Sequence, residues 1–388
     1  MRIAFPTTEY VTESSYAGGL ANYLHRITGA LRDLGHEVHV LVVSDVEPGS
    51  FEHDGIRVHR MRWQHAARPV RVLKAGSSHK DAWMSHLVAA ELDRLHRQFR
   101  FDVIQYPSYR ALALGRLRGV PSVVRISSHR RLWNQAGAGS LDRVAERLEL
   151  SALRRADAVY APSRLLAEAV SADARIDVSV IEPPFHAETP GQDETTAEHL
   201  ADRPYLLFYG TLSELKGVGT IARAIGDILE LDSSLRFVFI GKDGGLSGGP
   251  AVEVLRAAAG GEADRIVHMP PIPHEQLYPV IRNARAVVLP SLVDNLPNTC
   301  LESMGLGQIV IGTRGASFDQ LITDGESGFL CEPGDASSLY QAVSRALSLS
   351  RSERQRIAAA ARARIAELEP SKAAGRLVDF FRGLGVER

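Results

Sequence analysis

Two successive series of alternating strand-like and helix-like segments constrain the fold of this chain more than any other feature of its sequence. The strand-like segments are short runs rich in apolar and β-branched residues. They are predicted at 3–5, 38–43, 103–106, 122–126, 158–161 and 178–181 in the first series, and at 205–209, 237–240, 266–268, 287–289 and 309–311 in the second. A repeated strand–helix order is typical of parallel sheets with helices on both faces. We therefore predict an α/β protein with two doubly wound, Rossmann-like domains, whose sheet edges face each other across a cleft.

One helix of the first series is especially clear. Between residues 20 and 34, apolar residues recur at alternating spacings of four and three, and Gly35 ends the run. At the junction of the two series, residues 182–204 are rich in proline and carry a polar run, which is typical of an interdomain linker. We predict an N-terminal domain at 1–182, a linker at 183–204, a C-terminal domain at 205–369 and a final helical segment at 370–388.

The bulk composition excludes several classes of protein. The 388 residues carry a formal net charge of −1 and no long basic run, which excludes a general nucleic-acid binder. No run approaches the roughly 18 apolar residues of a membrane-spanning helix, which leaves at most peripheral membrane contact. The first residues lack the apolar core of a secretion signal, so we expect a cytoplasmic protein. Cys300 and Cys331 offer neither a disulfide framework nor a metal-binding pattern.

Residues 285–312 carry the strongest functional signal. A buried strand is followed by a polar loop with Asp294, by a short helix that opens near Asn298 and Thr299 and carries Glu302, and by a second strand. The helix N-terminus is expected at the carboxyl edge of a parallel sheet, where bare N–H groups favour phosphate. Two carboxylates beside an anion site suit a ligand with both phosphates and hydroxyls, such as a nucleotide-sugar. The alternative is that Asp294 is a turn residue and that Glu302 only complements the helix dipole.

A glycine-rich loop follows the first strand of each series. Gly18 and Gly19 precede the first helix, where glycines let the backbone approach a ligand closely; the alternative is an ordinary turn. In the second series, Gly210–Gly217 has the sequence GTLSELKG, and Lys216 lies at the start of the next helix. Its ammonium group suits a diphosphate, whereas the alternative is a solvated surface lysine.

A third loop, at 123–133, leads from a buried strand into a polar and basic segment. His129 is a candidate for a polar contact near a reacting sugar. Arg130 and Arg131, with Arg125, suit an acceptor that is anionic or presented at an anionic surface. Arg68 and Arg71 lie in another polar stretch and are expected nearby. The alternative is a surface histidine beside solvated arginines.

Three motifs, in their order along the chain, resemble those of glycosyltransferase family 4: the GG turn, GTLSELKG and PSLVDNLPNTCLESMGLGQIVIG. Members of that family have the GT-B fold and are retaining, nucleotide-sugar-dependent enzymes. The resemblance is strongest over residues 205–335. It implies that Lys216 binds the donor diphosphate, that Glu302 binds ribose and that Asp294 contacts the donor sugar. Backbone near Ile272 would meet the base.

The resemblance gives a donor-binding set that consists of Gly18, Gly19, Gly210, Thr211, Lys216, Ile272, Asp294, Asn298, Thr299 and Glu302. It also shows departures from the family pattern. The family often has glutamate at the position of Asp294, and it commonly has an arginine at the position of Thr211, so one diphosphate contact is absent here. The family histidine lies nearer to Ser127, and assigning it to His129 requires a register shift. The family fold further implies that the segment 370–388 crosses back to the first domain.

The sequence therefore predicts a retaining glycosyltransferase that moves a sugar from an NDP-sugar to a hydroxyl acceptor. His129, Lys216 and Asp294 are the catalytic candidates, and the family mechanism is a front-face substitution in which the leaving phosphate helps to deprotonate the acceptor. We expect no metal and no other cofactor, because there is no Asp-x-Asp after a strand and no His/Cys cluster in the sequence. Two rivals stay open: a nucleotide-sugar epimerase of the same architecture, and a catalytically degenerate sugar-nucleotide-binding subunit.

Overall fold

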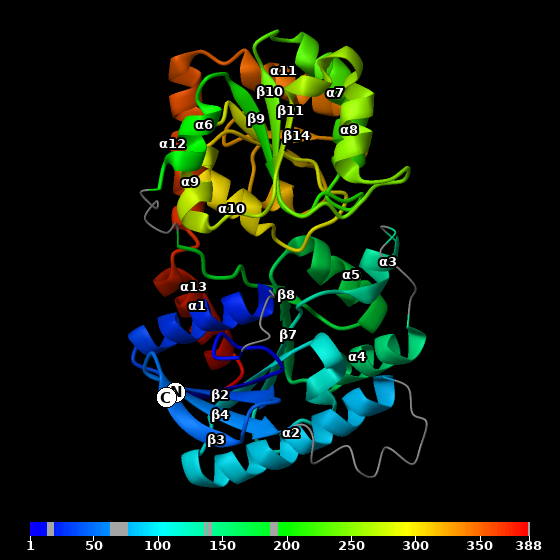
Figure 1. Cartoon of the computed structure of the whole chain (residues 1–388). Coiled ribbons are helices and arrows are strands. Elements are labelled where there is room, and N and C mark those ends of the chain that lie inside the picture. Colours follow the sequence, from blue (N-terminus) through cyan, green and yellow to red (C-terminus); the bar gives the residue numbers. More distant parts are fainter. Residues whose placement is uncertain (14–18, 63–76, 136, 138–141, 187–192, 387–388) are drawn as a thin grey trace. The chain divides into compact units, whose positions relative to one another are not determined.

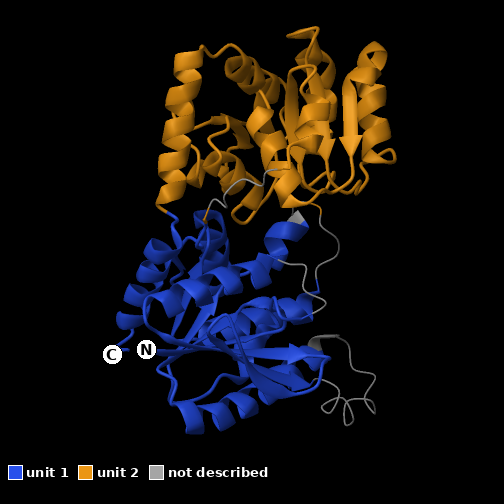
Figure 2. Cartoon of the chain, turned by 60° about the vertical axis from the view of Figure 1, so that its left-hand side comes forward, with its two compact units in different colours: residues 1–135, 139–185, 368–388 blue, residues 136–138, 186–367 orange. Residues whose placement is uncertain are grey.

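The computed structural model describes residues 1–13, 19–62, 77–135, 137, 142–186 and 193–386 (Figure 1). Contacts between Cα atoms divide the chain into two compact units, each with a sheet of its own (Figure 2). The first unit holds residues 1–135, 139–185 and 368–388, and the second holds 136–138 and 186–367. The final helix, α13 (Pro370–Arg382), therefore belongs to the first unit, although it follows the second unit in the sequence.

The described part of the first unit forms an eight-stranded sheet. Its strands are β1 (Arg2–Thr7), β2 (Glu37–Ser44), β3 (Gly49–His53), β4 (Ile56–Arg62), β5 (Val103–Pro107), β6 (Ser122–Arg125), β7 (Ala158–Ala161) and β8 (Ser179–Val180). They lie in the order β3-β4-β2-β1-β5-β6-β7-β8, and all neighbours are parallel except β3 and β4. The strand order reverses between β1 and β5, as in a doubly wound sheet.

Helices cover both faces of this sheet. They are α1 (Gly19–Asp33), α2 (Ser77–Phe99), η2 (Tyr109–Gly115), α3 (Arg130–Gln135), α4 (Arg143–Arg155), α5 (Arg164–Ala174) and α13. Successive strand residues point to opposite faces. In β1, Ile3 and Phe5 belong to the core that includes α1 and α13, whereas Ala4 belongs to the core with α2, α4 and α5. The chain thus returns from the second unit to complete one of the two cores of the first.

The β3–β4 hairpin was not among the predicted strands. Its two strands are antiparallel and are joined by Asp54 and Gly55, both with positive φ (48° and 72°), which is typical of a type I′ turn. His59 of β4 is buried and stacks on the buried His39 of β2, with ring centroids 5.3 Å apart. Short strands that carry histidine and arginine give a weak apolar pattern, so the sequence does not reveal this hairpin.

The described part of the second unit holds a six-stranded sheet whose strands are all parallel. They are β9 (Tyr205–Tyr209), β10 (Arg236–Ile240), β11 (Ile266–Met269), β12 (Ala286–Leu289), β13 (Val310–Thr313) and β14 (Phe329–Cys331), in the order β11-β10-β9-β12-β13-β14. The helices are α6 (Thr195–Leu200), α7 (Val218–Glu230), α8 (Ala251–Ala259), η3 (Gly260–Arg265), α9 (His274–Asn283), α10 (Asn298–Gly305), η4 (Phe318–Gln320), α11 (Ala336–Leu347) and α12 (Arg351–Ala366). The prediction of two doubly wound α/β domains is confirmed.

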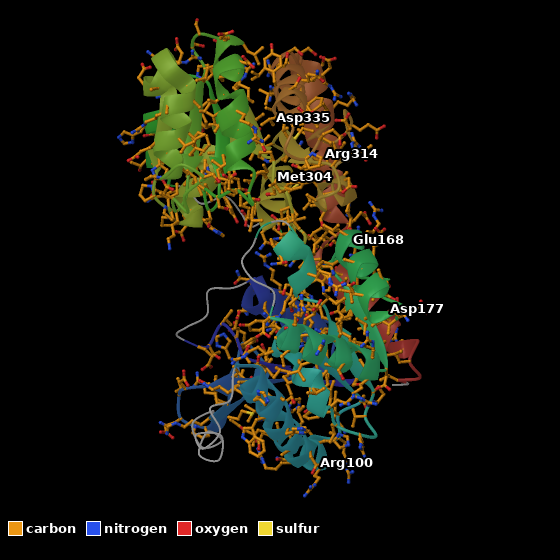
Figure 3. All side chains as sticks on the ribbon, turned by 90° about the vertical axis from the view of Figure 1, so that its right-hand side faces the viewer. Arg100, Glu168, Asp177, Met304, Arg314 and Asp335 are labelled. Carbon is orange, nitrogen blue, oxygen red and sulfur yellow. The ribbon has the colours of Figure 1, made fainter. Side chains whose placement is uncertain are left out.

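Charged side chains lie on the surface of each unit. Glu168 and Asp177 of the first unit are exposed, as are Arg314 and Asp335 of the second, whereas Met304 is buried (Figure 3). Within the described residues, no helix combines the length and the apolar character that crossing a bilayer requires.

Candidate active site

Two loops of the second unit flank the point where its strand order reverses. β9 and β12 are adjacent and parallel; β10 and β11 lie beyond β9, while β13 and β14 lie beyond β12. The loop 210–217 follows β9, and the loop 290–297 follows β12. Doubly wound sheets bind ligands at such a switch point, beyond the carboxyl ends of the strands. The topology therefore selects the same two loops as the sequence motifs.

These two loops are held together by their backbones. The N–H of Leu292 donates a hydrogen bond to the carbonyl of Leu215, at 2.9 Å. Gly217 has a φ of +74°, and a Cβ atom at this position would lie 1.8 Å from the carbonyl oxygen of Pro290. Any side chain would push the loops apart, so only glycine fits. The loop that carries Lys216 is thereby fixed against the loop that carries Asp294.

The contact between the loops brings two predicted residues together. The ammonium nitrogen of Lys216 lies 2.5 Å from Oδ2 of Asp294. The side chain of Lys216 is 37% exposed and that of Asp294 is 12% exposed, so the pair lies at the surface with the carboxylate turned inwards. The other carboxylate oxygen accepts a hydrogen bond from the N–H of Asn295, and the carbonyl of Asp294 accepts one from Ser317. Asp294 is therefore held from both sides.

The N-terminus of α10 opens at the same sheet edge. Its N-cap residue is Pro297, whose side chain provides no capping hydrogen bond. Asn298 is exposed and Thr299 is half-buried, so the first turn is accessible from solvent. Uncapped N–H groups and the helix dipole together favour an anion at this end.

Glu302 lies one turn further along α10 and is buried, with 8% of its surface exposed. The hydroxyl of Tyr209, the last residue of β9, lies 3.3 Å from Oε2 of Glu302. The same hydroxyl makes a shorter contact, 2.6 Å, to the carbonyl of Thr299, and lies 3.0 Å from the hydroxyl of Ser303. Burial raises the pKa of Tyr209 well above its ordinary value, so the phenol stays neutral. Tyr209 thus ties the first turn of α10 to the end of β9.

The remaining donor-side candidates lie on loops after β9 and β11. Gly210 directly follows β9 with a φ of +129°, and a Cβ atom built on Gly241, after β10, would lie 1.9 Å from its carbonyl oxygen. Thr211 is exposed. Ile272 is half-buried in the loop between β11 and α9. All three candidates therefore lie beyond the carboxyl ends of parallel strands.

In the first unit, Gly18 lies outside the described residues, and Gly19 is the first residue of α1. His129 follows β6 and is buried, with 6% of its surface exposed. Its Nε2 atom lies 2.7 Å from Oδ2 of Asp173, a residue of α5. The N–H of Ser127 donates to the hydroxyl of Ser108. His129 is therefore a buried, carboxylate-paired histidine rather than a solvated surface one.

The basic residues after β6 form ion pairs with carboxylates of the same unit. Arg130 pairs with Glu149 (3.0 Å), and Arg131 pairs with Glu146 and Asp173. Burial raises the pKa of Glu149, and Arg130 opposes that rise. Both arginines, which the sequence analysis considered for an anionic acceptor, are therefore ion-paired within the first unit.

Arg125 is also not a surface cation. It is 8% exposed, and its guanidinium lies over the ring of Tyr23, 3.7 Å from the ring centroid. Arg68 and Arg71, the two further arginines considered for an anionic acceptor, lie outside the described residues.

Two family models together match nearly the whole chain. Residues 18–183 match the model described as a glycosyl transferase 4-like domain, and residues 192–364 match the model described as glycosyl transferases group 1. The chain belongs to the family 4 glycosyltransferases. It is therefore an enzyme of the glycosyltransferase class, and its two doubly wound units are those of the GT-B fold.

Individual relatives agree with this assignment. This glycosyltransferase is 28% identical over 364 residues to a D-inositol 3-phosphate glycosyltransferase of Acidothermus cellulolyticus, an alignment that covers 85% of this chain and 78% of the relative. Among solved structures, it resembles a sucrose-phosphate synthase of Thermosynechococcus elongatus, with a TM-score of 0.75, 20% identity and 99% coverage of both chains. It also resembles an Anabaena protein crystallised with UDP-glucose, with a TM-score of 0.71, 16% identity, and coverage of 99% and 100%. The last two similarities show the fold.

Asp173 and Tyr209 of this glycosyltransferase contact candidate site residues but were not predicted from the sequence. Asp173 lies on a helix 44 positions after His129, and nothing local marks it as a partner. Tyr209 does carry a signal: it ends an apolar strand, and a buried tyrosine hydroxyl requires a hydrogen-bond partner.

Proposed function

We propose that this glycosyltransferase moves a sugar from an NDP-sugar to a hydroxyl acceptor, with retention of anomeric configuration and without a metal ion. The proposal rests above all on the pair of Lys216 and Asp294 beside the uncapped N-terminus of α10, at the switch point of the second unit. A mobile cation and a helix N-terminus are the groups that bind and neutralise a diphosphate without a metal.

In this proposal, each group has one partner on the donor. The diphosphate receives the ammonium of Lys216 and the N–H groups of Asn298 and Thr299. Glu302 accepts hydrogen bonds from the ribose hydroxyls. Lys216 turns from Asp294 to the diphosphate. Asp294 then accepts a hydrogen bond from a hydroxyl of the sugar. Together these contacts would hold the ribose, the diphosphate and the sugar, which are joined in that order in an NDP-sugar.

The chemical step is a substitution on one face of the sugar. The bond between the anomeric carbon and the oxygen of the β-phosphate breaks, and the acceptor oxygen bonds to the same face. The acceptor proton passes to the departing phosphate oxygen. Negative charge grows on the phosphate during this step, so Lys216 and the N-terminus of α10 act mainly by stabilising that charge. His129 is proposed to supply a polar contact to the sugar.

The acceptor is proposed to be an anionic polyol, such as a phosphorylated cyclitol. Support comes from the Acidothermus relative, which is named for inositol 3-phosphate. Because Arg130 and Arg131 are neutralised internally, they are not assigned to the acceptor in this proposal.

The test is a matrix of donors and acceptors. The purified enzyme is incubated with UDP-, GDP-, ADP- and dTDP-sugars, with and without phosphorylated and neutral polyols, in buffer containing EDTA. Release of NDP that depends on a polyol, together with a product of the donor's anomeric configuration, supports the proposal. Inverted product, a requirement for Mg²⁺ or Mn²⁺, an epimerised donor without acceptor, or nucleotide binding without turnover would each contradict a stated part of it.

A further inference from the structure

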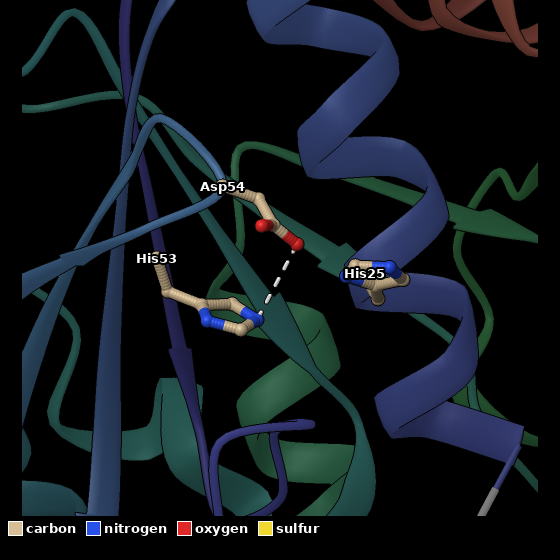
Figure 4. Close-up of side chains that lie close together, drawn as sticks. All are labelled: His25, His53 and Asp54. Carbon is tan, nitrogen blue, oxygen red and sulfur yellow. Dashed lines mark ion pairs between the residues drawn. The ribbon is translucent and has the colours of Figure 1, made fainter.

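Three metal-binding side chains converge in the first unit, away from the residues assigned to the donor. They are His25 of α1, His53 at the end of β3 and Asp54 in the β3–β4 turn (Figure 4). One ligand atom from each lies within 4.8 Å of the other two. Nε2 of His53 lies 3.5 Å from Oδ2 of Asp54, and the ring centroids of His25 and His53 are 6.4 Å apart. Two imidazoles and one carboxylate are a ligand set of zinc and iron(II) sites.

The hairpin turn fixes two of the three ligands. His53 pairs with Ile56 across a connection of only two residues, Asp54 and Gly55. Both connecting residues have positive φ, and Asp-Gly is a favoured sequence for this type I′ turn. The positions of His53 and Asp54 are therefore set by the backbone rather than by flexible loop residues.

A separate contact holds this turn against α1. Arg32 lies seven residues after His25, two helical turns along, and thus on the same face of the helix. Its guanidinium donates a hydrogen bond to the carbonyl of Asp54. A Cβ atom on Gly55 would lie 2.8 Å from Cδ of Arg32, which shows how closely the turn approaches the helix. The distance between the helix and the turn is therefore fixed without a contribution from a metal.

Tyr10 packs against the inner side of these three side chains. The ring of Tyr10 is fully buried and meets His53 edge-on, with centroids 6.5 Å apart, and its hydroxyl lies 3.3 Å from that of Thr28. On the outer side, His25 and Asp54 are exposed. An ion can therefore reach these three side chains from solvent, and their inner side is closed by packed side chains.

We propose that His25, His53 and Asp54 bind one divalent transition-metal ion of the zinc class, with solvent completing its coordination. Bonds of about 2.0–2.2 Å require ligand atoms closer together than 4.8 Å, and the exposed side chains of His25 and Asp54 have room to close that gap. The ion would clamp the β3–β4 turn to α1. None of the three residues belongs to the proposed donor site, so the clamp is structural and separate from sugar transfer.

No metal was expected from the sequence, because neither an Asp-x-Asp after a strand nor a His/Cys cluster occurs in it. His25 and His53 are 28 positions apart, with β2 between their elements, and they meet only through the fold. A three-ligand group of this kind has no local sequence signature.

The experiment uses the full chain without a histidine tag, stripped of metal with a chelator. Zn²⁺ is titrated by calorimetry, and Co²⁺ is titrated by its visible absorption. We expect one ion per chain, Co²⁺ bands of a site with nitrogen and oxygen ligands, and a melting temperature that rises with Zn²⁺. His25→Ala removes an exposed side chain and should weaken binding roughly tenfold or more. Asp54→Asn keeps a residue that tolerates positive φ and should also weaken binding.

His86→Ala is the matched control, since His86 is an exposed helical histidine of the same unit. This variant should bind Zn²⁺ like the wild type. The proposal is overturned if the wild-type chain binds no stoichiometric ion, or if His25→Ala binds Zn²⁺ as tightly as His86→Ala does.

Discussion

The ammonium nitrogen of Lys216 lies 2.5 Å from a carboxylate oxygen of Asp294, although the two residues are 78 positions apart in the sequence. Lys216 is more than one-third exposed, and such ion pairs contribute only about 0–1 kcal/mol to folding. The pair therefore matters less for stability than for charge: each residue neutralises the other until a ligand competes for one of them.

Lys216→Ala should lower kcat more than it raises the KM for the donor. The cation is most valuable when charge has built up on the leaving phosphate, so its loss weakens the transition state more than the ground state. The measurement is steady-state kinetics with varied donor, with Lys80→Ala, an exposed lysine of α2, as the control. If Lys216→Ala has a wild-type kcat/KM, the assignment of Lys216 is wrong.

Asp294→Asn should tighten the binding of the NDP product and slow sugar transfer. The substitution removes the carboxylate that neutralises Lys216, and one charge near a diphosphate at the protein surface is worth about 1 kcal/mol or more, or roughly a fivefold to tenfold change in Kd. Calorimetry with NDP and turnover assays measure the two effects. Weaker NDP binding by the variant would contradict this account.

Glu302→Gln should reduce donor affinity by roughly one to two orders of magnitude, because a charge-assisted hydrogen bond is worth about 1.5–3 kcal/mol. The variant keeps the shape of a buried side chain and can still accept a hydrogen bond from Tyr209. Its melting temperature should therefore stay close to that of the wild type. Calorimetry is carried out with the nucleoside diphosphate and with the free nucleobase. Weaker binding of the diphosphate alone indicates a lost ribose contact, whereas weaker binding of both indicates a loss of fold.

Tyr209→Phe should lower stability by about 1–3 kcal/mol and also raise the donor KM, because it leaves the Thr299 carbonyl and the Ser303 hydroxyl without this partner. Tyr205→Phe is a matched control. Tyr205 is on the same strand, and its buried hydroxyl donates to the carbonyl of Val280 in α9. Denaturant unfolding should show a similar loss for both variants, but only Tyr209→Phe should change the donor KM. Equal KM values for the two variants would remove Tyr209 from the site.

The first unit should lose stability when the pH falls from about 6.5 to about 4. Burial lowers the pKa of His59 to about 4, and burial also lowers the pKa of His39, which is hydrogen-bonded to His59. The unfolded chain takes up these protons near pH 6.5, so in this range it binds more protons than the folded chain. From the shift of its pKa, His59 alone should lower the free energy of unfolding by about 3 kcal/mol over this pH range.

Urea unfolding at several pH values measures this dependence. His59→Gln removes the titrating group and should flatten the curve between pH 4 and 6.5. An unchanged slope in the variant would show that other groups carry the acid sensitivity.

The secondary structure and the loop positions around the proposed donor site were largely predictable from sequence. A strand at 286–289 and a helix at 298–305 follow from local apolar periodicity, and parallel strands place the loops after β9 and β12 at one edge. The proximity of Lys216 and Asp294 follows from that topology. Their direct pairing does not, because it depends on the close approach of Gly217 to the Pro290 carbonyl.

The rest depended on contacts between distant elements. The sequence does not reveal the ion pairs of the arginines after β6, because their partners Glu146, Glu149 and Asp173 come from other helices. Likewise, the contact of the Tyr209 hydroxyl with α10 could not be predicted locally, because α10 follows Tyr209 by almost ninety residues. Local patterns predict elements and their order, whereas charge pairing requires the packed structure.

The return of α13 to the first unit makes the second unit an insertion in the chain of the first. The chain leaves the first unit at Phe185 and re-enters it at Leu368, and the N–H of Phe185 donates to the carbonyl of Leu368 at 2.8 Å. Because the exit and the re-entry are hydrogen-bonded neighbours, a folded second unit costs the first little loop-closure entropy. During synthesis, residues 186–367 are available to fold before α13 exists, and the core that α13 shares with α1 is completed last.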